Sequence, residues 1–462
     1  MGDAEGALEV LGRDMGRDPT LAAELAKAYL AIGQAKGPYS AVGSEGDPAA
    51  AAPYVRKSLE IYRKLSQTSP SNLSLTTGKL DALAAWLHLQ YRLDDGKEGR
   101  RAAAELLAEV QALTPALRAR VEPQRYRSTA YLELGIIQSG EEQNAEAVAS
   151  HRLAVSTFLD HIPPGWLADP ARLEHLAHAN RELAVTLLMN EGSGPEAEDA
   201  ARRAAEAVAH CAEPPCRMRH AQSLGTLGEI EFASGETKEG TADLRRGLAE
   251  FEALAAEDPA NAVFSNAAAQ LRDYLALALR GSPEALALAR KNVRVAAGAD
   301  RELTRGRERL AVHGIVLGAT LAAAGRYADA EDELRSVLSQ IGKWNVNADL
   351  TWSACHELAL AYEAQGDFAQ QFAAARQAWD ATRDIDTKAI AGRIQHSLAA
   401  RDLASAAAHW PAATSVDRAQ ARQLLDQWCT GLAPRRGTLV GALIAAPPDP
   451  AEVATLRKLL GG

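Results

Sequence analysis

The residues best suited to chemistry lie close together in the segment "HCAEPPCRMRH", which contains His210, Cys211, Cys216 and His220. Thiolate and imidazole are ligands that zinc prefers in proteins, but this spacing matches none of the common zinc modules. We therefore expect no metal and keep the four residues only as candidates. The alternative is that both cysteines pack as small apolar residues where two helices meet, with both histidines solvated. A disulfide between them is a third, less favoured interpretation.

A second pair, His175 and His178, is three residues apart on a predicted helix. That spacing places both imidazoles on one helix face, where they could share a metal ion. The sequence offers no evident third ligand. We therefore interpret both histidines as solvated or as lining a groove.

Familiar catalytic motifs are missing from the sequence. It contains no phosphate-binding GxxxxGK[ST], no dinucleotide-binding GxGxxG, no GxSxG and no HExxH, and "HELAL" at His356 lacks the second histidine that a metal would need. The nucleotide and magnesium signatures of kinases are missing as well. The sequence thus predicts a chain that is not an enzyme and that has no cofactor.

Composition favours helices. The chain has 462 residues, too many for one compact core, so several domains or an elongated repeat array are expected. Apolar residues make up 47% but aromatic residues only 5%, and alanine dominates over the strand-forming types. The formal net charge of −10 argues against a large surface for nucleic acid, because such binding displaces counterions with lysine and arginine.

We expect no insertion into a membrane. The most apolar run near the end, "TLVGALIAAP", is far shorter than the roughly 20 residues that span a bilayer, and no segment resembles a signal peptide. The four cysteines are too few and too scattered for a disulfide scaffold. These features indicate a cytoplasmic protein in a reducing compartment.

Internal repeats organise the chain. Leucine stands eight residues ahead of a glycine in four segments, in which the glycines are Gly33, Gly235, Gly325 and Gly366. A leucine and a neighbouring small residue on one helix face let a second helix approach closely, and the glycine then ends the helix in the left-handed conformation. The pattern predicts helix-turn-helix units stacked on copies of themselves.

Helix pairs are predicted to begin near residues 21, 74, 123, 171, 217, 262, 307, 350 and 387, a period of roughly 37 to 53 residues. The predicted fold is all-α, an α-solenoid of roughly eight to nine degenerate antiparallel helix pairs that forms a superhelix. Residues 1–19 are expected to be the second half of a truncated repeat and residues 20–432 the repeat array. Residues 433–462 are expected to form a tail with a short capping helix.

The stretch "GQAKGPYSAVGSEGDP" interrupts the first helix pair. We interpret residues 34–46 as a loop inserted into the turn of one repeat. Long loops without regular structure are often functional. The alternative is that a long loop at a solvent-exposed turn costs little, because closure entropy grows slowly with length.

The segments "LGATLAAAGRYADA" and "LALAYEAQGDFAQQ" resemble the tetratricopeptide repeat, an antiparallel helix pair, although the period here is longer. Residues 20 to 70, preceded by a half repeat ending in "RDP", also resemble the helical-repeat half of large bacterial serine/threonine protein kinases. That resemblance implies a regulatory or partner-binding module and no catalysis by this chain, with a kinase domain fused upstream in the full-length protein.

In the tetratricopeptide family, the first helix of each pair lines a concave groove. Counting back from the turn glycines places Glu229, His356 and Glu363 on that side, and a less regular unit adds Arg181. The set is mixed and partly acidic, which favours a basic or neutral extended segment over a terminal carboxylate. The leading hypothesis is a scaffold for a protein or peptide partner; the alternatives are a ligand-sensing array that controls a fused serine/threonine kinase, and an enzyme. The oligomeric state stays open.

Overall fold

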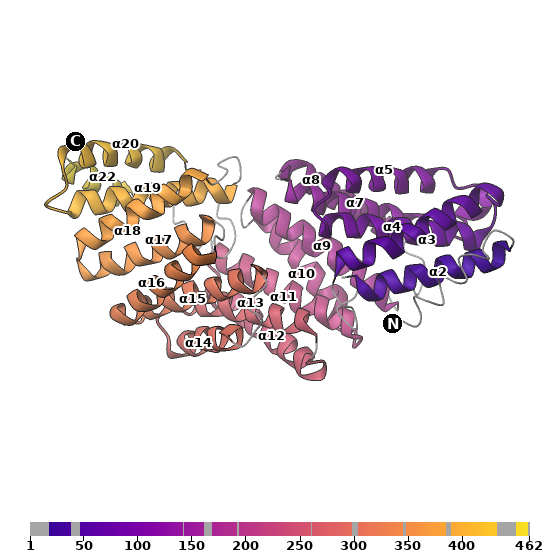
Figure 1. The fold of residues 1–462 in the computed structure, drawn as a ribbon, viewed down its shortest axis with the longest axis horizontal. Helices are drawn as coiled ribbons and strands as arrows, with labels where there is room; N and C mark the ends of the chain where they lie inside the picture. Colours follow the sequence, from indigo (N-terminus) through magenta and orange to yellow (C-terminus); the bar gives the residue numbers. More distant parts are fainter. Residues whose placement is uncertain are drawn as a thin grey trace. The chain divides into compact units, whose positions relative to one another are not determined.

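The computed structural model describes residues 18–37, 47–141, 143–160, 169–191, 194–259, 261–297, 304–344, 348–384, 390–431 and 450–460. Within these ranges every regular element is helical and no strand occurs (Figure 1). The prediction of an all-α fold is confirmed.

The helices follow one another with short connections. The first ten are α2 (Pro19–Lys36), α3 (Pro48–Thr68), α4 (Leu73–Arg92), α5 (Gly96–Gln111), α6 (Pro115–Arg118), α7 (Pro123–Gly140), α8 (Asn144–Leu159), α9 (Pro170–Glu191), α10 (Pro195–Val208) and α11 (Pro214–Ser234). They are followed by α12 (Thr237–Glu257), α13 (Ala262–Ala278), α14 (Pro283–Ala297), α15 (Thr304–Ala323), α16 (Tyr327–Trp344), α17 (Ala348–Gln365), α18 (Phe368–Ala381), a 3-10 turn η2 (Thr382–Asp384), α19 (Ile390–His409), α20 (Ser415–Gly431) and α22 (Pro450–Leu459).

Local sequence explains where many helices begin. The carboxylate of Asp18 accepts a hydrogen bond from the backbone N–H of Thr20 at 2.8 Å, and Asp47 does the same for Ala50 at 3.0 Å. A proline follows each of these aspartates, and proline suits the first helical position because the N–H it lacks would have no partner there. The "DP" dipeptides are therefore helix starts.

The helices form antiparallel pairs. Consecutive helices pack as α2 with α3, α4 with α5, α7 with α8, α15 with α16, α17 with α18 and α19 with α20. First helices of neighbouring pairs also contact each other, as in α4 with α7 and α15 with α17. All nine expected pair starts lie within three residues of an observed helix start. The prediction of stacked helix pairs is confirmed.

The chain divides into two compact units. The first unit takes in the ranges Met1–Thr186, Asp199–Ser223 and Ala253–Phe264, and the second takes in Leu187–Glu198, Leu224–Glu252 and Ser265–Gly462.

Three of the four predicted turn glycines end their helices as expected. Gly235, Gly325 and Gly366 have φ angles of 94°, 73° and 72°, in the left-handed region where glycine is unstrained. The prediction for Gly33 is wrong. Gly33 is a buried residue within α2, and a Cβ there would lie 2.5 Å from Val55 Cγ2. Its role is to let α3 approach closely.

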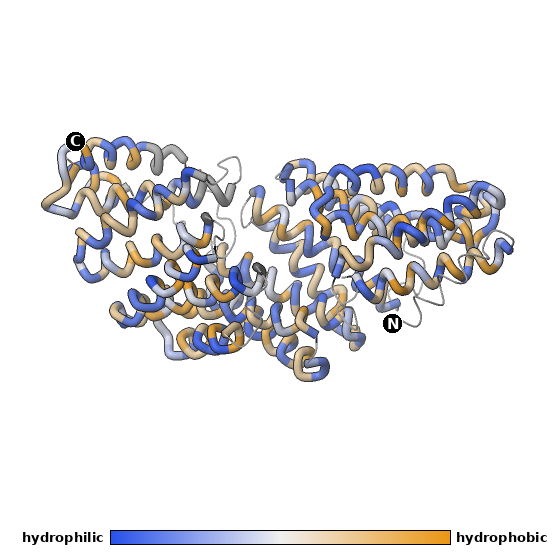
Figure 2. Tube along the Cα trace, in the orientation of Figure 1, coloured by the Kyte–Doolittle hydropathy of each residue, from blue (hydrophilic) through white to orange (hydrophobic). Residues whose placement is uncertain are grey.

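The core of each unit is built mainly from leucine and alanine. In the first unit, Leu80, Leu83 and Leu87 of α4 are fully buried beside Leu106 of α5. Burying a leucine stabilises the fold by about 1.5–3 kcal/mol, so the buried leucines of a single helix pair together contribute several times this amount. Hydrophobic and hydrophilic residues alternate along the helices (Figure 2). Within the described ranges, no helix combines the length and the apolar character that crossing a bilayer requires.

The inserted loop begins later than predicted. Helix α2 continues to Lys36, and the backbone N–H of Asp47 donates to the carbonyl of Lys36 at 2.9 Å, so the two ends of the insertion meet. Residues 38–46 lie outside the described residues, as do residues 1–17 of the expected half repeat. Of the expected tail, helix α22 is described, with Leu456 and Leu460 buried in a core shared with α19 and α20.

Candidate functional site

Polar side chains join the first helices of consecutive pairs in the first unit. Three contacts link residues that are 45 positions apart: Tyr126 O–H to Asp81 Oδ1 at 2.7 Å, His88 Nδ1 to Glu133 Oε1 at 2.8 Å, and Arg219 Nε to Glu174 Oε1 at 2.9 Å. A constant separation means that each contact joins equivalent positions of neighbouring repeats. The polar residues on α4, α7, α9 and α11 are therefore in register.

Glu133 is the central residue of this arrangement. It lies on α7, 45 residues after His88 of α4 and 45 before His178 of α9, and its side chain is 6% exposed. Burial by itself would raise the pKa of Glu133, but the charge and hydrogen bond of His88 and the charge of His178 hold it below its usual value. Glu133 is therefore ionised at neutral pH. Its second oxygen, Oε2, is buried without a hydrogen-bond partner among the described residues.

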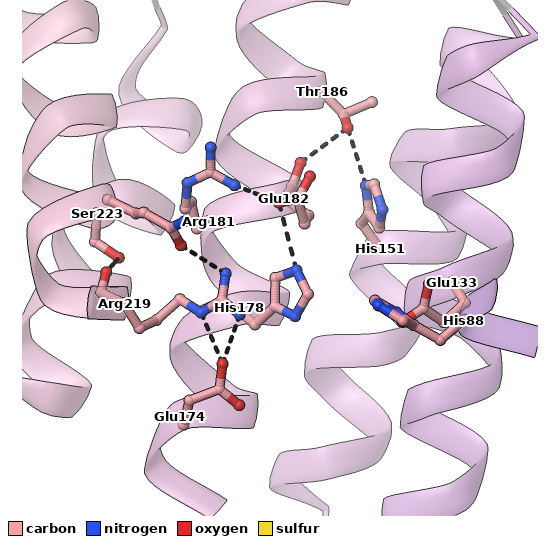
Figure 3. A network of polar contacts seen from close by, with 11 residues as sticks. His88, Glu133, His151, Glu174, His178, Arg181, Glu182, Thr186, Arg219 and Ser223 are labelled. Carbon is pink, nitrogen blue, oxygen red and sulfur yellow. Dashed lines mark hydrogen bonds and ion pairs between the residues drawn. The ribbon is translucent and has the colours of Figure 1, made fainter. Parts of the chain in front are cut away.

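Glu182 is a second buried carboxylate on α9. It accepts a hydrogen bond from the neighbouring Arg181, and His178 lies 3.5 Å from it (Figure 3). Burial opposes ionisation, but the Arg181 charge and the His178 hydrogen bond lower the pKa of Glu182 far below its usual value. Arg181 and His178 thus already compensate the Glu182 charge, whereas the described residue in contact with the Glu133 carboxylate is the imidazole of His88.

Tyr91 adds an aromatic ring beside His88 on α4. It lies on α4, one turn beyond His88, and is 40% exposed. Burial of its hydroxyl and the negative charges of Glu182 and Glu133 raise the pKa of Tyr91 above its usual value. The positive charges of Arg92 and Arg181 act in the opposite direction, and the hydroxyl stays neutral at neutral pH.

Two hydroxyl–imidazole contacts in the first unit have the composition of a nucleophile and a base. Ser128 Oγ lies 2.8 Å from His175 Nε2, and Thr186 Oγ1 lies 3.0 Å from His151 Nδ1. Both hydroxyls are buried, and each donates its proton to a backbone carbonyl, that of Ala154 or Glu182, so neither can be activated by its histidine. We assign them a structural role.

The two histidines in these contacts are neutral in the folded chain. Burial lowers the pKa of both His151 and His175 to about 4. His175 is half-buried, so it is not a freely solvated histidine, and its place at a groove stays a prediction. Its ring packs 4.6 Å from that of Phe158, between centroids, and His178 is half-buried as well.

The predicted groove residues are distributed over both units. Arg181 belongs to the network around Glu182 in the first unit, and Glu229 lies half-buried on α11 in the second. Glu363 on α17 is half-buried and accepts hydrogen bonds from Arg401 Nη1 at 3.1 Å and Ser405 Oγ at 2.6 Å. These contacts place it in a network with α19.

The expectation that His356 lines an open surface is wrong. His356 is 3% exposed, stacks on Trp352 and hydrogen-bonds to the fully buried Asp402. Burial disfavours its charge, but Asp402 raises the pKa of His356, and His356 with Arg401 lowers the pKa of Asp402. The sequence could not show this because Asp402 lies 46 residues away.

The cysteine pair differs from the favoured prediction. Cys211 and Cys216 form a disulfide across the turn between α10 and α11, and Cys216 packs against Ala177 and Val208. The two cysteines do lie at a helix junction, but they are covalently bonded to each other there. With both sulfurs bonded to each other, neither is a thiolate ligand. His210 is exposed and His220 is half-buried.

Among the described residues, one group has acidic oxygens close enough for a metal ion. The oxygens of Glu198, Glu231 and Glu236 lie within 4.8 Å of one another. Acidic clusters are common without a bound ion, so this group by itself indicates no metal site.

Sequence reasoning found Arg181 but missed His88, Tyr91, Glu133 and Glu182. The sequence did contain a signal for His88 and Glu133. His88, Glu133 and His178 are spaced by 45 residues, which is the spacing of equivalent positions in this part of the array. What the sequence could not reveal is that their side chains meet.

No family model and no curated protein matches the sequence. Among solved structures, the chain is similar to the crystal structure of BtubC (BKLC) from P. vanneervenii, with a TM-score of 0.36 and 14% identity over 64% of this chain and 91% of that one. It is also similar to the apo form of RapI, with a TM-score of 0.40 and 11% identity over 88% of this chain and 86% of that one. Its similarity to yeast Tom70 has a TM-score of 0.29, with 12% identity over 99% of this chain and 92% of that one. At scores this low the likenesses identify neither a partner nor an activity.

Proposed function

We propose that the first unit is a non-catalytic scaffold that binds an extended segment of a partner protein across its first helices. One observation carries the proposal: half-exposed polar and aromatic side chains on α4 and α9 flank the buried Glu133 of α7 in a repeating register. Exposed fractions are 23% for the His88 side chain and 25% for that of Arg181. A segment crossing these helices would meet them in succession.

The positions of these side chains are fixed before any partner arrives. His88 is held by Glu133, and Arg181 by Glu182. Binding groups that are already ordered lose less conformational entropy when a partner docks, which favours affinity. Stacked repeats are suited to such segments because their contact surface is extended.

The partner we propose is a protein and not a nucleic acid. The chain carries a formal net charge of −10, and the network contains Glu133, Glu174 and Glu182 beside two arginines. Phosphate groups would be repelled by such a surface.

Site-directed photocrosslinking tests the proposal. Tyr91 and Arg181 would each be replaced by p-benzoylphenylalanine, with Arg101 on the second helix α5 as the control because its side chain is 72% exposed. We expect crosslinks from the first two positions to one partner segment, identified by mass spectrometry, and none from the control. Equal crosslinking at all three positions, or none at any, would contradict the proposal.

The wider role we propose is that of a regulatory module in a larger signalling protein. The support is the resemblance of residues 20 to 70 to the repeat region of bacterial serine/threonine kinases. An immunoblot of the native polypeptide tests it: a species several hundred residues longer is expected, and a species of about 49.1 kDa would count against it.

The cytoplasmic location of the protein is also a proposal. Four scattered cysteines favour a reducing cytoplasm, whereas the Cys211–Cys216 disulfide is typical of an oxidising environment. Alkylating the protein in intact cells, before lysis, decides between them by showing whether the pair is reduced.

A further inference from the structure

The carboxylate of Glu133 is incompletely satisfied. Oε1 accepts the hydrogen bond from His88, whereas Oε2 is buried with no donor among the described residues. A buried acceptor left without a donor costs about 1–3 kcal/mol, and more when it is charged, so such a group calls for a specific explanation.

The charges around Glu133 are also unbalanced. Arg181 compensates Glu182, and Arg219 compensates Glu174. The group in contact with Glu133 is the imidazole of His88, with the imidazole of His178 acting on it over a longer distance. Neither imidazole is a permanent cation, so among the described residues Glu133 is a buried carboxylate with no lysine or arginine in contact with it.

An exposed aromatic ring completes the surroundings. Tyr91 lies on α4 one turn beyond His88, the residue that bonds Glu133, and its hydroxyl feels the negative charges of Glu182 and Glu133 as well as the positive charges of Arg92 and Arg181. Aromatic faces attract cations, and this attraction adds to that of a nearby carboxylate. A half-exposed tyrosine one helical turn from the residue that bonds Glu133 therefore suits a positively charged group.

We propose that Glu133, assisted by Tyr91, receives a cationic side chain from the partner segment, the ammonium of lysine or the guanidinium of arginine. The inference rests on the proposed binding of an extended segment to the first unit. A cation supplies both the missing donor and the missing charge, whereas a neutral amide supplies only the donor and an anion supplies neither. The long aliphatic stems of lysine and arginine suit a charge that lies below the surface.

Selection from a displayed library of random dodecapeptides tests this inference. The bait would be the full chain, in parallel with its Glu133→Gln variant. Glutamine has the same shape and keeps an acceptor for His88, so the fold is preserved, as circular dichroism would verify. We expect peptides selected by the unchanged chain to share a lysine or arginine at one fixed position, and Glu133→Gln to lose that preference.

Affinities of synthetic peptides then measure the effect. Replacing the shared basic residue by glutamine should weaken binding to the unchanged chain about tenfold or more, the value of a charge-assisted hydrogen bond, and should leave binding to Glu133→Gln almost unchanged. Exchanging lysine and arginine separates ammonium from guanidinium recognition. Tyr91→Ala, at an exposed position, should weaken binding several-fold.

The matched control is Glu105→Gln. Glu105 is a half-buried glutamate on the second helix α5, bonded to Arg63, and its replacement should leave peptide affinity unchanged. Selected peptides without a shared basic residue, or peptides bound equally by Glu133→Gln, would overturn the inference and leave the proposed function standing. If no peptide is selected and no segment crosslinks, both fail.

Discussion

His88 and Glu133 occupy equivalent positions, 45 residues apart on consecutive first helices, and their side chains are hydrogen-bonded at 2.8 Å. His178 stands at the next equivalent position on α9 and lowers the pKa of the same glutamate. One repeat position thus carries histidine, glutamate and histidine in succession, so the spacing of the repeats themselves assembles the network. The stability of both units should depend on such buried polar contacts.

Asp402→Asn should destabilise the second unit. Asp402 is fully buried and bonds to both His356 and Arg401, so removing its charge leaves the buried His356 without its carboxylate partner, whereas Arg401 keeps Glu363 and Glu452. We expect a loss of about 3–5 kcal/mol in the free energy of unfolding, measured by urea denaturation. Asp380→Asn, which breaks an exposed pair with Arg383, should cost less than about 0.5 kcal/mol. Equal costs would show that the Asp402 network is not important for stability.

Stability should fall as the pH is lowered from 6.5 toward 4. Burial lowers the pKa of His151 and His175 from 6.5 to about 4, so between these values the unfolded chain binds protons that the folded chain does not. Each histidine then removes about 3 kcal/mol from the free energy of unfolding by pH 4, and it removes none above pH 6.5.

The combined variant His151→Gln/His175→Gln should show a shallower pH dependence in urea denaturation. His356→Gln is the control with the opposite sign. Because Asp402 raises the pKa of His356, this histidine contributes stability below pH 6.5 that is lost as the pH rises through its folded pKa. Protonation of His151 or His175 in the folded chain at pH 6, seen by NMR, would contradict the assignment.

Gly240→Ala should be destabilising, because Gly240 lies against a neighbouring helix of the same unit. A Cβ at this position would lie 2.6 Å from the carbonyl oxygen of Gly228 and 2.8 Å from the backbone nitrogen of Phe232. Backbone atoms cannot move aside cheaply, so we expect a cost of about 1–3 kcal/mol in thermal or urea unfolding.

Gly342→Ala is the matched control for that substitution. Gly342 is helical, and nothing lies within 4 Å of the position of its Cβ, so alanine should stabilise α16 by about 0.5–1 kcal/mol. The prediction fails if both variants shift stability in the same direction.

Reduction of the Cys211–Cys216 disulfide should lower stability by about 2 kcal/mol, the chain-entropy value for a loop this short. The melting temperature with and without a reductant measures it, and Cys211→Ser/Cys216→Ser should be insensitive to the reductant. Cys355 should stay unalkylated in the folded chain, because burial raises the pKa of its thiol to about 12. A melting temperature unaffected by reduction would contradict the prediction.

The sequence by itself determined the helices and their pairing. Leucine, small residues and turn glycines recur at fixed local distances, and helix starts follow from aspartate and proline, so Gly235, Gly325 and Gly366 were predictable from their neighbours. Gly33 was not, because whether a glycine ends a helix or admits a neighbouring helix depends on what packs against it.

Only the tertiary structure decided which polar groups meet. His356 has the local sequence of an exposed first-helix residue, yet Asp402, 46 positions away, makes it a buried ion-pair partner. The candidate site likewise joins His88, Glu133 and Glu182 from three helices. Periodicity reports which face of a helix is apolar, but hydrogen bonding and desolvation depend on atoms brought together by the stacking of whole repeats.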